Sequence, residues 1–328
     1  MKISILRYIA CPMCYGNLIL QDFRLEDNEV KEGALVCRKC GQKYSIMRFL
    51  PILTPPYIKP YDWISVEITK IKEKYGLKEG LLHLIEGKLK PIKPKPGGSL
   101  LSQEELQEGE YRESREYWER RLRKIKREQI VSGDLEKIWN IFIVMSGVES
   151  AKEVLDVGTG LGAMLTYIAD KWPEKGLFAL GISYVNLKAV RGKLKYFKIG
   201  ENVHLVVGDA LNMPFKSNIF DVVESWFGLG SIIEFKKVIR QAYRVLKRGG
   251  RFTVSGAWGE AYINFSMLSK IIKSLATQEY EKLIKFLREK ELMLHVNEVT
   301  KTFKEVGFHD IEVFEEKNLY VVTGRKSV

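Results

Sequence analysis

Residues 153–162 read Glu-Val-Leu-Asp-Val-Gly-Thr-Gly-Leu-Gly, an apolar run that leads into three regularly spaced glycines. The apolar run predicts a buried β-strand, and the residues from about Ala163 onward predict a helix. Glycines let backbone approach a ligand closely, and the first turn of a helix has free N–H groups to bind it. The stretch therefore indicates a ligand-binding loop, but its glycine spacing also fits a dinucleotide fingerprint.

Apolar segments and helical patterns alternate along the chain after this loop. Each apolar segment has the length of a strand, and stretches of helical length separate them. Strands are expected at 177–182, at 204–207, from 220 onward and at 251–255, with a helix at 234–247. Such alternation predicts an α/β fold with a parallel sheet and right-handed crossovers.

Three motifs follow one another in this part of the chain. They are Asp156-x-Gly158-x-Gly160-x-Gly162, Gly208-Asp209-Ala210 and Leu246-Lys247-Arg248-Gly249-Gly250. The series resembles the class I S-adenosylmethionine-dependent methyltransferases, especially their quinone-biosynthesis-like branch. The resemblance covers about residues 130–328, including a closing hairpin near 310–315 and 319–324. It implies a Rossmann-like, doubly wound α/β fold with a seven-stranded sheet.

The resemblance also implies which residues bind S-adenosylmethionine. The glycines of the loop would hold the methionine part of the cofactor through backbone contacts, and Asp156 would order the loop or reach the ammonium group. Asp209 would accept a hydrogen bond from the adenine amino group, or else it only caps a turn. The expected cofactor-binding residues are Asp156, Gly158, Thr159, Gly160, Gly162, Ser183, Asp209 and Ala210.

One position departs from the family pattern. The family usually has an acid after the second strand that holds both ribose hydroxyls, and Gly181 aligns there; no Asp or Glu occurs between Glu174 and Glu201. Ser183 or Asn186 is the candidate substitute. An acid contributes two charge-assisted hydrogen bonds, so its loss predicts weak cofactor binding, or binding that needs another segment.

The residues after the fourth strand indicate which atoms are methylated. They read Glu224-Ser225-Trp226-Phe227-Gly228, without the Asn-Pro-Pro-Tyr motif of enzymes that methylate amino groups. Transfer to N, O or an activated carbon, driven by proximity and alignment, remains. Glu224 is the candidate general base, or else a structural acid. Aromatic residues could wall an acceptor pocket or fill core; they are Trp226, Trp258, Tyr262 and Phe265.

All four cysteines of the chain lie in its first 40 residues, as two CxxC pairs at Cys11/Cys14 and Cys37/Cys40. Two such turns can complete a tetrahedron of thiolates around Zn²⁺. Disulfides or redox pairs are the alternatives. A four-thiolate zinc site has no position open for water, so the zinc would be structural, and no cysteine would remain for covalent catalysis.

The sequence around these cysteines resembles a second family. Residues 9–18, 35–46 (with Cys-Gly-x-x-Tyr-x-Ile) and Leu50-Pro51-Ile52-Leu53 are similar to a zinc-ribbon family of methyltransferase activators. The resemblance covers about residues 5–55. Members of that family serve enzymes that modify tRNA, rRNA and release factors, which implies a protein or RNA partner for the ribbon.

The chain divides into a zinc ribbon at 1–55, a helical connector or cap at 56–130 and a methyltransferase domain at 131–328. Prolines at 51, 55, 56 and 60 mark the first boundary, and residues 62–90, 103–130 and 134–146 have helical patterns. The helix at 103–130 either docks one apolar stripe on the core, or its Tyr117 and Trp118 cap the ligand site.

Composition restricts the class of protein further. The chain has 328 residues, a net charge of +12 and no apolar run long enough for a membrane helix, which predicts a cytoplasmic protein. Charge and ribbon favour methylation of RNA (tRNA or rRNA) or a translation-related macromolecule. The alternatives are a methyltransferase for a small molecule (a quinone, lipid or metabolite) and a non-catalytic binding protein.

Overall fold

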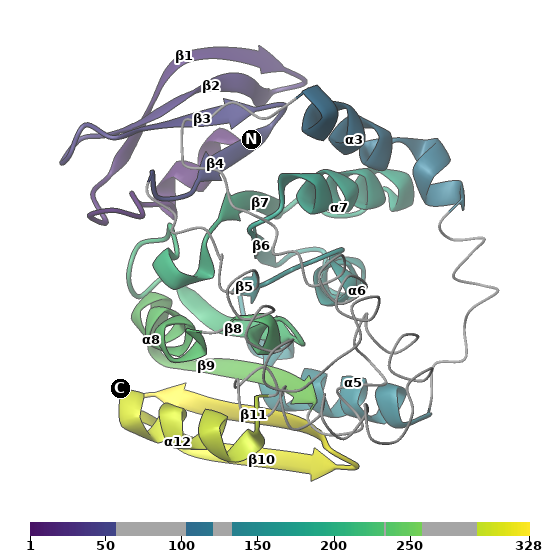
Figure 1. The fold of residues 1–328 in the computed structure, drawn as a ribbon, viewed down its shortest axis with the longest axis vertical. Helices are drawn as coiled ribbons and strands as arrows, with labels where there is room; N and C mark the ends of the chain where they lie inside the picture. The colour runs from purple at the N-terminus through teal and green to yellow at the C-terminus, as the bar shows by residue number, and fades with distance from the viewer. Residues whose placement is uncertain (57–102, 121–132, 233, 258–293) are drawn as a thin grey trace, which may run out of the picture.

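The computed structural model describes residues 1–56, 103–120, 133–232, 234–257 and 294–328 (Figure 1). Within these residues one eleven-stranded sheet runs through the molecule in the order β1-β2-β3-β4-β7-β6-β5-β8-β9-β11-β10. Seven of these strands form the expected doubly wound α/β sheet. They are β5 (Glu153–Val157), β6 (Gly176–Gly181), β7 (Val203–Gly208), β8 (Phe220–Trp226), β9 (Leu246–Ala257), β10 (Phe308–Glu316) and β11 (Leu319–Lys326).

Helices cover both faces of this sheet. The apolar residues of α5, α6 and α7 pack on one face, and those of α8 and α12 pack on the other. The bounds are α5 (Gly133–Ser146), α6 (Ala163–Lys171), α7 (Tyr184–Phe197), α8 (Phe235–Val245) and α12 (Val296–Val306). Five strands run parallel from β7 to β9, and β11 and β10 close this end as an antiparallel hairpin. The predicted α/β fold is therefore confirmed.

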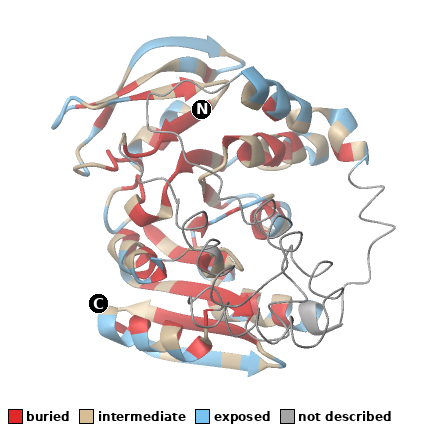
Figure 2. Cartoon of the chain, viewed as in Figure 1, coloured by how far each residue is buried: buried red, intermediate tan, exposed pale blue. Residues whose placement is uncertain are grey.

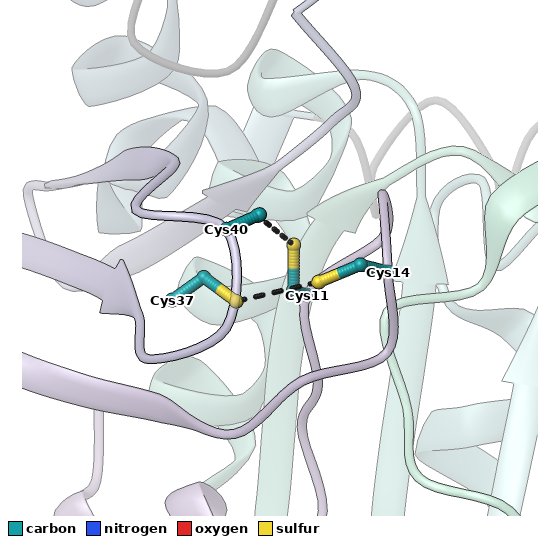
Figure 3. Close-up of side chains that lie close together, drawn as sticks. All are labelled: Cys11, Cys14, Cys37 and Cys40. Atoms are coloured by element: carbon teal, nitrogen blue, oxygen red, sulfur yellow. Dashed lines mark hydrogen bonds between the residues drawn. The ribbon is translucent and has the colours of Figure 1, made fainter.

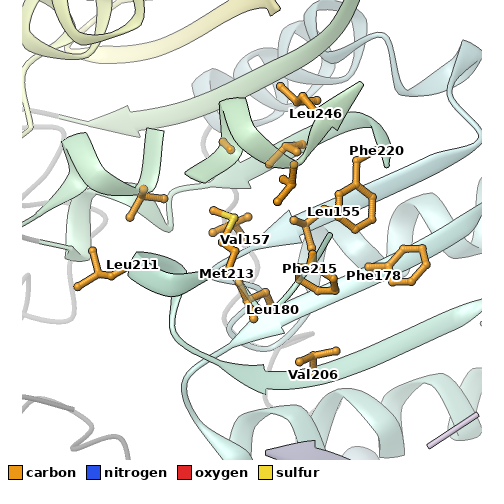
Figure 4. Packing of buried hydrophobic residues seen from close by; sticks show 14 of the residues in the cluster. Leu155, Val157, Phe178, Leu180, Val206, Leu211, Met213, Phe215, Phe220 and Leu246 are labelled. Atoms are coloured by element: carbon orange, nitrogen blue, oxygen red, sulfur yellow. The ribbon is translucent and has the colours of Figure 1, made fainter. Parts of the chain in front are cut away.

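The central strands are buried on both faces, as expected for a parallel sheet covered by helices. Along β5, Val154 points into the cluster beneath α5, α6 and α7, and Leu155 points into the cluster beneath α8 and α12. Three aromatic side chains interlock at the centre of the second cluster, Phe178, Phe215 and Phe220, with ring centroids 5.1–6.2 Å apart (Figure 4). Buried residues follow every strand of the sheet centre in Figure 2.

Residues 1–53 form the ribbon, with a 3₁₀ turn at Ile3–Arg7 and four strands. The strands are β1 (Leu18–Glu26), β2 (Glu29–Cys37), β3 (Lys43–Met47) and β4 (Leu50–Leu53). The first three pairings are antiparallel, but β4 pairs in parallel with β7 of the large sheet, with Ile52 opposite Val207 and Leu53 opposite Gly208. The ribbon therefore extends the seven-stranded sheet instead of standing beside it, as the upper part of Figure 1 shows.

Helix α3 (Gln103–Glu113) and the turn after it lie against α7. The indole of Trp118 is buried and donates a hydrogen bond to the carbonyl of Ala189, 3.0 Å away. Gly192 lets the two backbones approach, because a Cβ atom there would lie 2.4 Å from the carbonyl oxygen of Glu113. Trp118 thus docks on α7, which is the first of the two arrangements expected for this segment.

Charged side chains tie this helix to α7 and to the ribbon. The carboxylate of Glu113 is bonded to Lys188, to Lys195 at 2.5 Å and to Arg191 at 3.2 Å. Arg191 also pairs with Glu29 of β2 at 2.7 Å. One network of ion pairs therefore joins connector, core and ribbon.

Several predictions fall outside the described residues. The predicted helix at 62–90 and the end of the predicted helix at 103–130 belong to this group, as do Trp258, Tyr262 and Phe265. The helical prediction at 134–146 corresponds to α5. Among the helices that the structure describes, none is long and apolar enough to cross a membrane.

Candidate functional site

The glycine loop joins β5 to α6 at the carboxyl end of the sheet, where ligands bind in open α/β folds. All three of its glycines have positive φ angles, 76° at Gly158, 54° at Gly160 and 67° at Gly162. A Cβ atom on Gly158 would lie 3.2 Å from the Cα of Gly228, in the loop after β8. The loop is therefore built for close backbone approach, and Gly162 is the N-cap residue of α6.

Asp209 and Ala210 lie in the loop after β7, two strands from β5 in the sheet. The carboxylate of Asp209 accepts hydrogen bonds from the backbone N–H of Leu211 at 2.9 Å and from the amide of Asn212 at 3.1 Å. These bonds cap the short 3₁₀ turn Ala210–Asn212. Burial raises the pKa of Asp209 above its usual range. Each carboxylate oxygen has two lone pairs, so the side chain can still accept from a ligand.

The ribose position lies at the end of β6. Ser183 is the N-cap residue of α7 and accepts from the backbone N–H of Asn186 at 3.2 Å, while Asn186 accepts from Arg112 of α3 at 3.3 Å. Both candidate substitutes for the missing acid therefore already have hydrogen-bond partners within the protein. A Cβ atom on Gly181 would meet Leu187 at 3.4 Å, which is an ordinary contact, so this position has room for a side chain.

Asp156 and Glu224 face one another across neighbouring strands, as register partners of β5 and β8. Their exposed fractions are 3% and 1%, and neither oxygen of Glu224 has a hydrogen-bond partner within the described chain. Burial raises the pKa of Asp156 to about 7. Burial, and then repulsion from Asp156, raise the pKa of Glu224 well above its ordinary value. The two carboxyl groups form a buried pair that the sequence motifs do not indicate.

Aromatic side chains stand beside the carboxyl end of β8. The ring of Trp226 lies 4.9 Å from Trp139, 5.1 Å from Phe142 and 4.9 Å from Phe227, all in edge-to-face contact. Trp139 and Phe142 come from α5, and Trp226 is the one residue of the predicted aromatic wall that the structure describes. The helical pattern of 134–146 predicts the helix that carries Trp139 and Phe142. The pattern does not show that these two side chains contact Trp226 of β8.

The four cysteines converge at one point of the ribbon (Figure 3). Their sulfur atoms all lie within 4.8 Å of one another, and Cys11–Cys40 and Cys14–Cys37 are 3.7 and 3.5 Å apart. Tetrahedral Zn²⁺ with bonds of about 2.3 Å places its sulfur ligands about 3.8 Å apart, so the donor set fits this ion. Four thiolates would fill the coordination shell and leave the metal a structural role.

Two family models match the chain. The model described as the ubiE/COQ5 methyltransferase family matches residues 125–315, more than half of the chain. The model described as Trm112p-like protein matches residues 4–48, which contain the four cysteines. Both resemblances inferred from motifs are thereby confirmed, together with S-adenosylmethionine as the cofactor of the first family.

Curated relatives carry a consistent description. The chain is 32% identical over 190 residues to the "Ubiquinone/menaquinone biosynthesis C-methyltransferase UbiE" of Pseudomonas paraeruginosa, covering 55% of this chain and 74% of that protein. It is 35% identical over 127 residues to the protein of the same name from Azotobacter vinelandii, covering 38% of this chain and half of that protein. Among solved structures, the CurJ carbon methyltransferase matches with a TM-score of 0.50 and 14% identity over 80% of this chain and 71% of its own, a likeness of fold.

These relatives overturn the prediction of methylation on RNA or a translation-related macromolecule, which is wrong. Their names support the alternative, a methyltransferase for a small quinone-like molecule. The net charge was a poor guide, because it counts residues over the whole chain and says nothing about their pairing. Arg191 and Lys247, for example, are each bonded to two acids.

Removal of the metal is expected to destabilise the whole described fold and not only the ribbon, because β4 is a strand of the large sheet. Chelation, or the variant Cys40→Ser, should lower the melting temperature by at least about 5 °C. Calorimetry with zinc quantification by mass spectrometry measures this, with Arg38→Ser in the same exposed turn as the control. A core transition that stays unchanged after complete loss of metal would contradict it.

Glu224→Gln is expected to stabilise the ligand-free protein at neutral pH. Because the folded-state pKa of Glu224 is raised, ionisation opposes folding as pH rises above the unfolded value of about 4.3. The variant should therefore match the wild type near pH 4 and exceed its unfolding free energy by about 1–3 kcal/mol near pH 8. Denaturant titrations at both pH values measure this. Glu153→Gln, which removes an ion pair with Lys247 on the same sheet, is the control and should not stabilise.

Proposed function

Since this chain belongs to the ubiE/COQ5 methyltransferase family, we propose that it is a C-methyltransferase that moves a methyl group from S-adenosylmethionine to a ring carbon of a quinone precursor. The observation that carries the proposal is the match to relatives whose names specify both the quinone and the carbon acceptor. The matched region spans only half to three quarters of the length of those relatives, and we propose this activity for the whole chain.

The glycine loop and the loop after β7 are the proposed cofactor site. The backbone of Gly158, Gly160 and Gly162, with Thr159, receives the methionine part, because side chains are absent where a ligand must approach closely. Asp209 and Ala210, at the end of β7 two strands away in the sheet, receive the adenine. Thr159 is held for this role by hydrogen bonds from its hydroxyl to the Asp156 carbonyl at 3.0 Å and from its N–H to the Leu180 carbonyl at 3.2 Å.

The acceptor is proposed to lie against Trp226, at the carboxyl end of β8. A flat, apolar ring fits an edge-to-face aromatic cluster such as the one that Trp226 forms with Trp139 and Phe142. The reduced quinol is the reactive form, because its hydroxyl groups make the ring carbon electron-rich. S-adenosylmethionine bound at these loops would supply the methyl group to that carbon, and the proton of the carbon would be released to solvent after the transfer. The protein would supply alignment and keep water away during the transfer.

The ribbon is proposed to support this enzyme from within the same chain. Its strand β4 occupies the edge of β7, and its residue Glu29 joins the ion network of α7. The partner expected for an activator-like ribbon is in this case the chain's own methyltransferase core.

The proposal is tested by incubating the full chain with methyl-labelled S-adenosylmethionine and either a reduced demethylated quinone or total RNA. Label is expected on the quinone ring, located by mass spectrometry, and not on RNA. Trp226→Ala should raise the KM for the quinol more than the KM for the cofactor. Transfer to an oxygen atom, or no transfer to any quinol while the cofactor binds, would overturn the assignment.

Gly181→Asp is expected to tighten cofactor binding. The position has room for a side chain, and a carboxylate there would accept charge-assisted hydrogen bonds from the ribose hydroxyls worth about 1.5–3 kcal/mol each. The Kd for S-adenosylmethionine should therefore fall about tenfold or more in isothermal calorimetry. Gly176→Asp at the other end of β6, where a Cβ atom also has ordinary contacts, is the control and should leave the Kd unchanged.

A further inference from the structure

A row of polar side chains crosses four strands beneath the face that carries α5, α6 and α7. Asp156, Glu224, Thr253 and Thr323 are successive register partners on β5, β8, β9 and β11. The two threonine hydroxyls bond to each other at 2.7 Å, and Thr323 also donates to the carbonyl of Phe252. That half of the row is satisfied internally, whereas both oxygens of Glu224 are buried without a partner.

The pair of Asp156 and the unpartnered Glu224 lies next to the proposed cofactor site. Gly158 follows Asp156 by two residues and Gly228 follows Glu224 by four, and these two glycines are in close backbone contact. A cation held by the glycine loop would therefore lie near both buried carboxyl groups, and charges interact strongly in a buried environment.

No charged side chain on the surrounding described elements neutralises the pair. The charged groups nearest to it along each packed element have partners of their own. Arg251 of β9 donates to the carbonyl of Met145, Lys193 of α7 donates to the carbonyl of Gly162 and to Thr166, and Glu153 and Asp221 share Lys247. Helix α5 presents Trp139 and Phe142, which do not titrate.

Two buried carboxyl groups side by side cannot both ionise without a compensating positive charge. We propose that Glu224 and Asp156 act together as a charge sensor that selects the cationic cofactor over its neutral product. The ligand-free pair keeps a proton, releases it to solvent when the positively charged S-adenosylmethionine binds, and takes one up again when methyl transfer leaves S-adenosylhomocysteine. The inference rests on the proposed function, and Glu224 acts here as a positioning residue rather than as the base.

The proton and charge balance of the cycle gives the sensor its effect. S-adenosylmethionine and S-adenosylhomocysteine both carry an ammonium and a carboxylate, and the sulfonium charge is what distinguishes them. With both carboxyl groups ionised, the pair compensates the sulfonium charge of S-adenosylmethionine. With one of them protonated, the pair carries one negative charge less, which suits the neutral thioether of S-adenosylhomocysteine. When the pair takes up a proton after transfer, the site loses one negative charge. The neutral product S-adenosylhomocysteine then dissociates from a site that is no longer charged to match a cation.

The proposal is tested by calorimetric titration of the full, zinc-loaded chain with each ligand between pH 5.5 and 8.5, in two buffers of different ionisation enthalpy. S-adenosylmethionine is expected to release close to one proton in the lower part of this range, and its Kd should fall by up to about tenfold per pH unit there. S-adenosylhomocysteine should release far less, with a nearly flat Kd.

Two variants separate the sensor from ordinary binding. Glu224→Gln should bind both ligands, lose the proton release and reduce the preference for S-adenosylmethionine, and Asp156→Asn should do the same if its loop remains folded. Glu153→Gln, at the opposite end of β5, should behave as the wild type. Equal proton release with both ligands, or undiminished release in Glu224→Gln, would overturn the sensor and leave the methyltransferase assignment standing. No binding of either ligand by the wild type at any pH would overturn both.

Discussion

The parallel pairing of β4 with β7 is the interaction on which the arrangement of this chain depends. A sheet edge exposes unpaired N–H and C=O groups, and β7 would be such an edge without Ile52 and Leu53 opposite it. All four residues of β4 are buried, and three of them join the apolar clusters, Leu50 and Ile52 on one side of the sheet and Leu53 on the other. The cysteine cluster lies next to the strands that lead to β4, so the ribbon and the methyltransferase core share one structure.

Ion pairs of the connector helix α3 strengthen this union. Glu113 lies among three basic residues of α7, and Arg191 reaches on to Glu29 of the ribbon. Bonds to charged groups that are largely removed from water are stronger than exposed ones. Pairing leaves the net charge of +12 unchanged, but it makes these basic side chains unavailable to a polyanion, so the net charge alone does not indicate an RNA-binding face.

The site combines a familiar loop with two unusual electrostatic features. Gly181 leaves the ribose position without an acid, whereas Glu224 adds an acid beside Asp156 at the other end of the proposed cofactor site. Negative charge is therefore placed near the methionine part of the cofactor and not near its ribose. An enzyme arranged in this way would recognise the charge that its cofactor loses in the reaction more than the nucleoside that it keeps.

The sequence by itself determined the α/β class and the four cysteines of one site, because strand length, glycine loops and CxxC turns are local patterns, and its family resemblance implied the seven strands of the core. It also located the glycines, Asp156 and Asp209. Tertiary structure alone decided that β4 joins β7, that Trp118 docks on α7 and that Glu224 faces Asp156. These contacts join residues far apart along the chain, 68 positions in the case of Asp156 and Glu224, and sheet register sets them. Register results from the packing of all strands and helices together, so no local pattern records it.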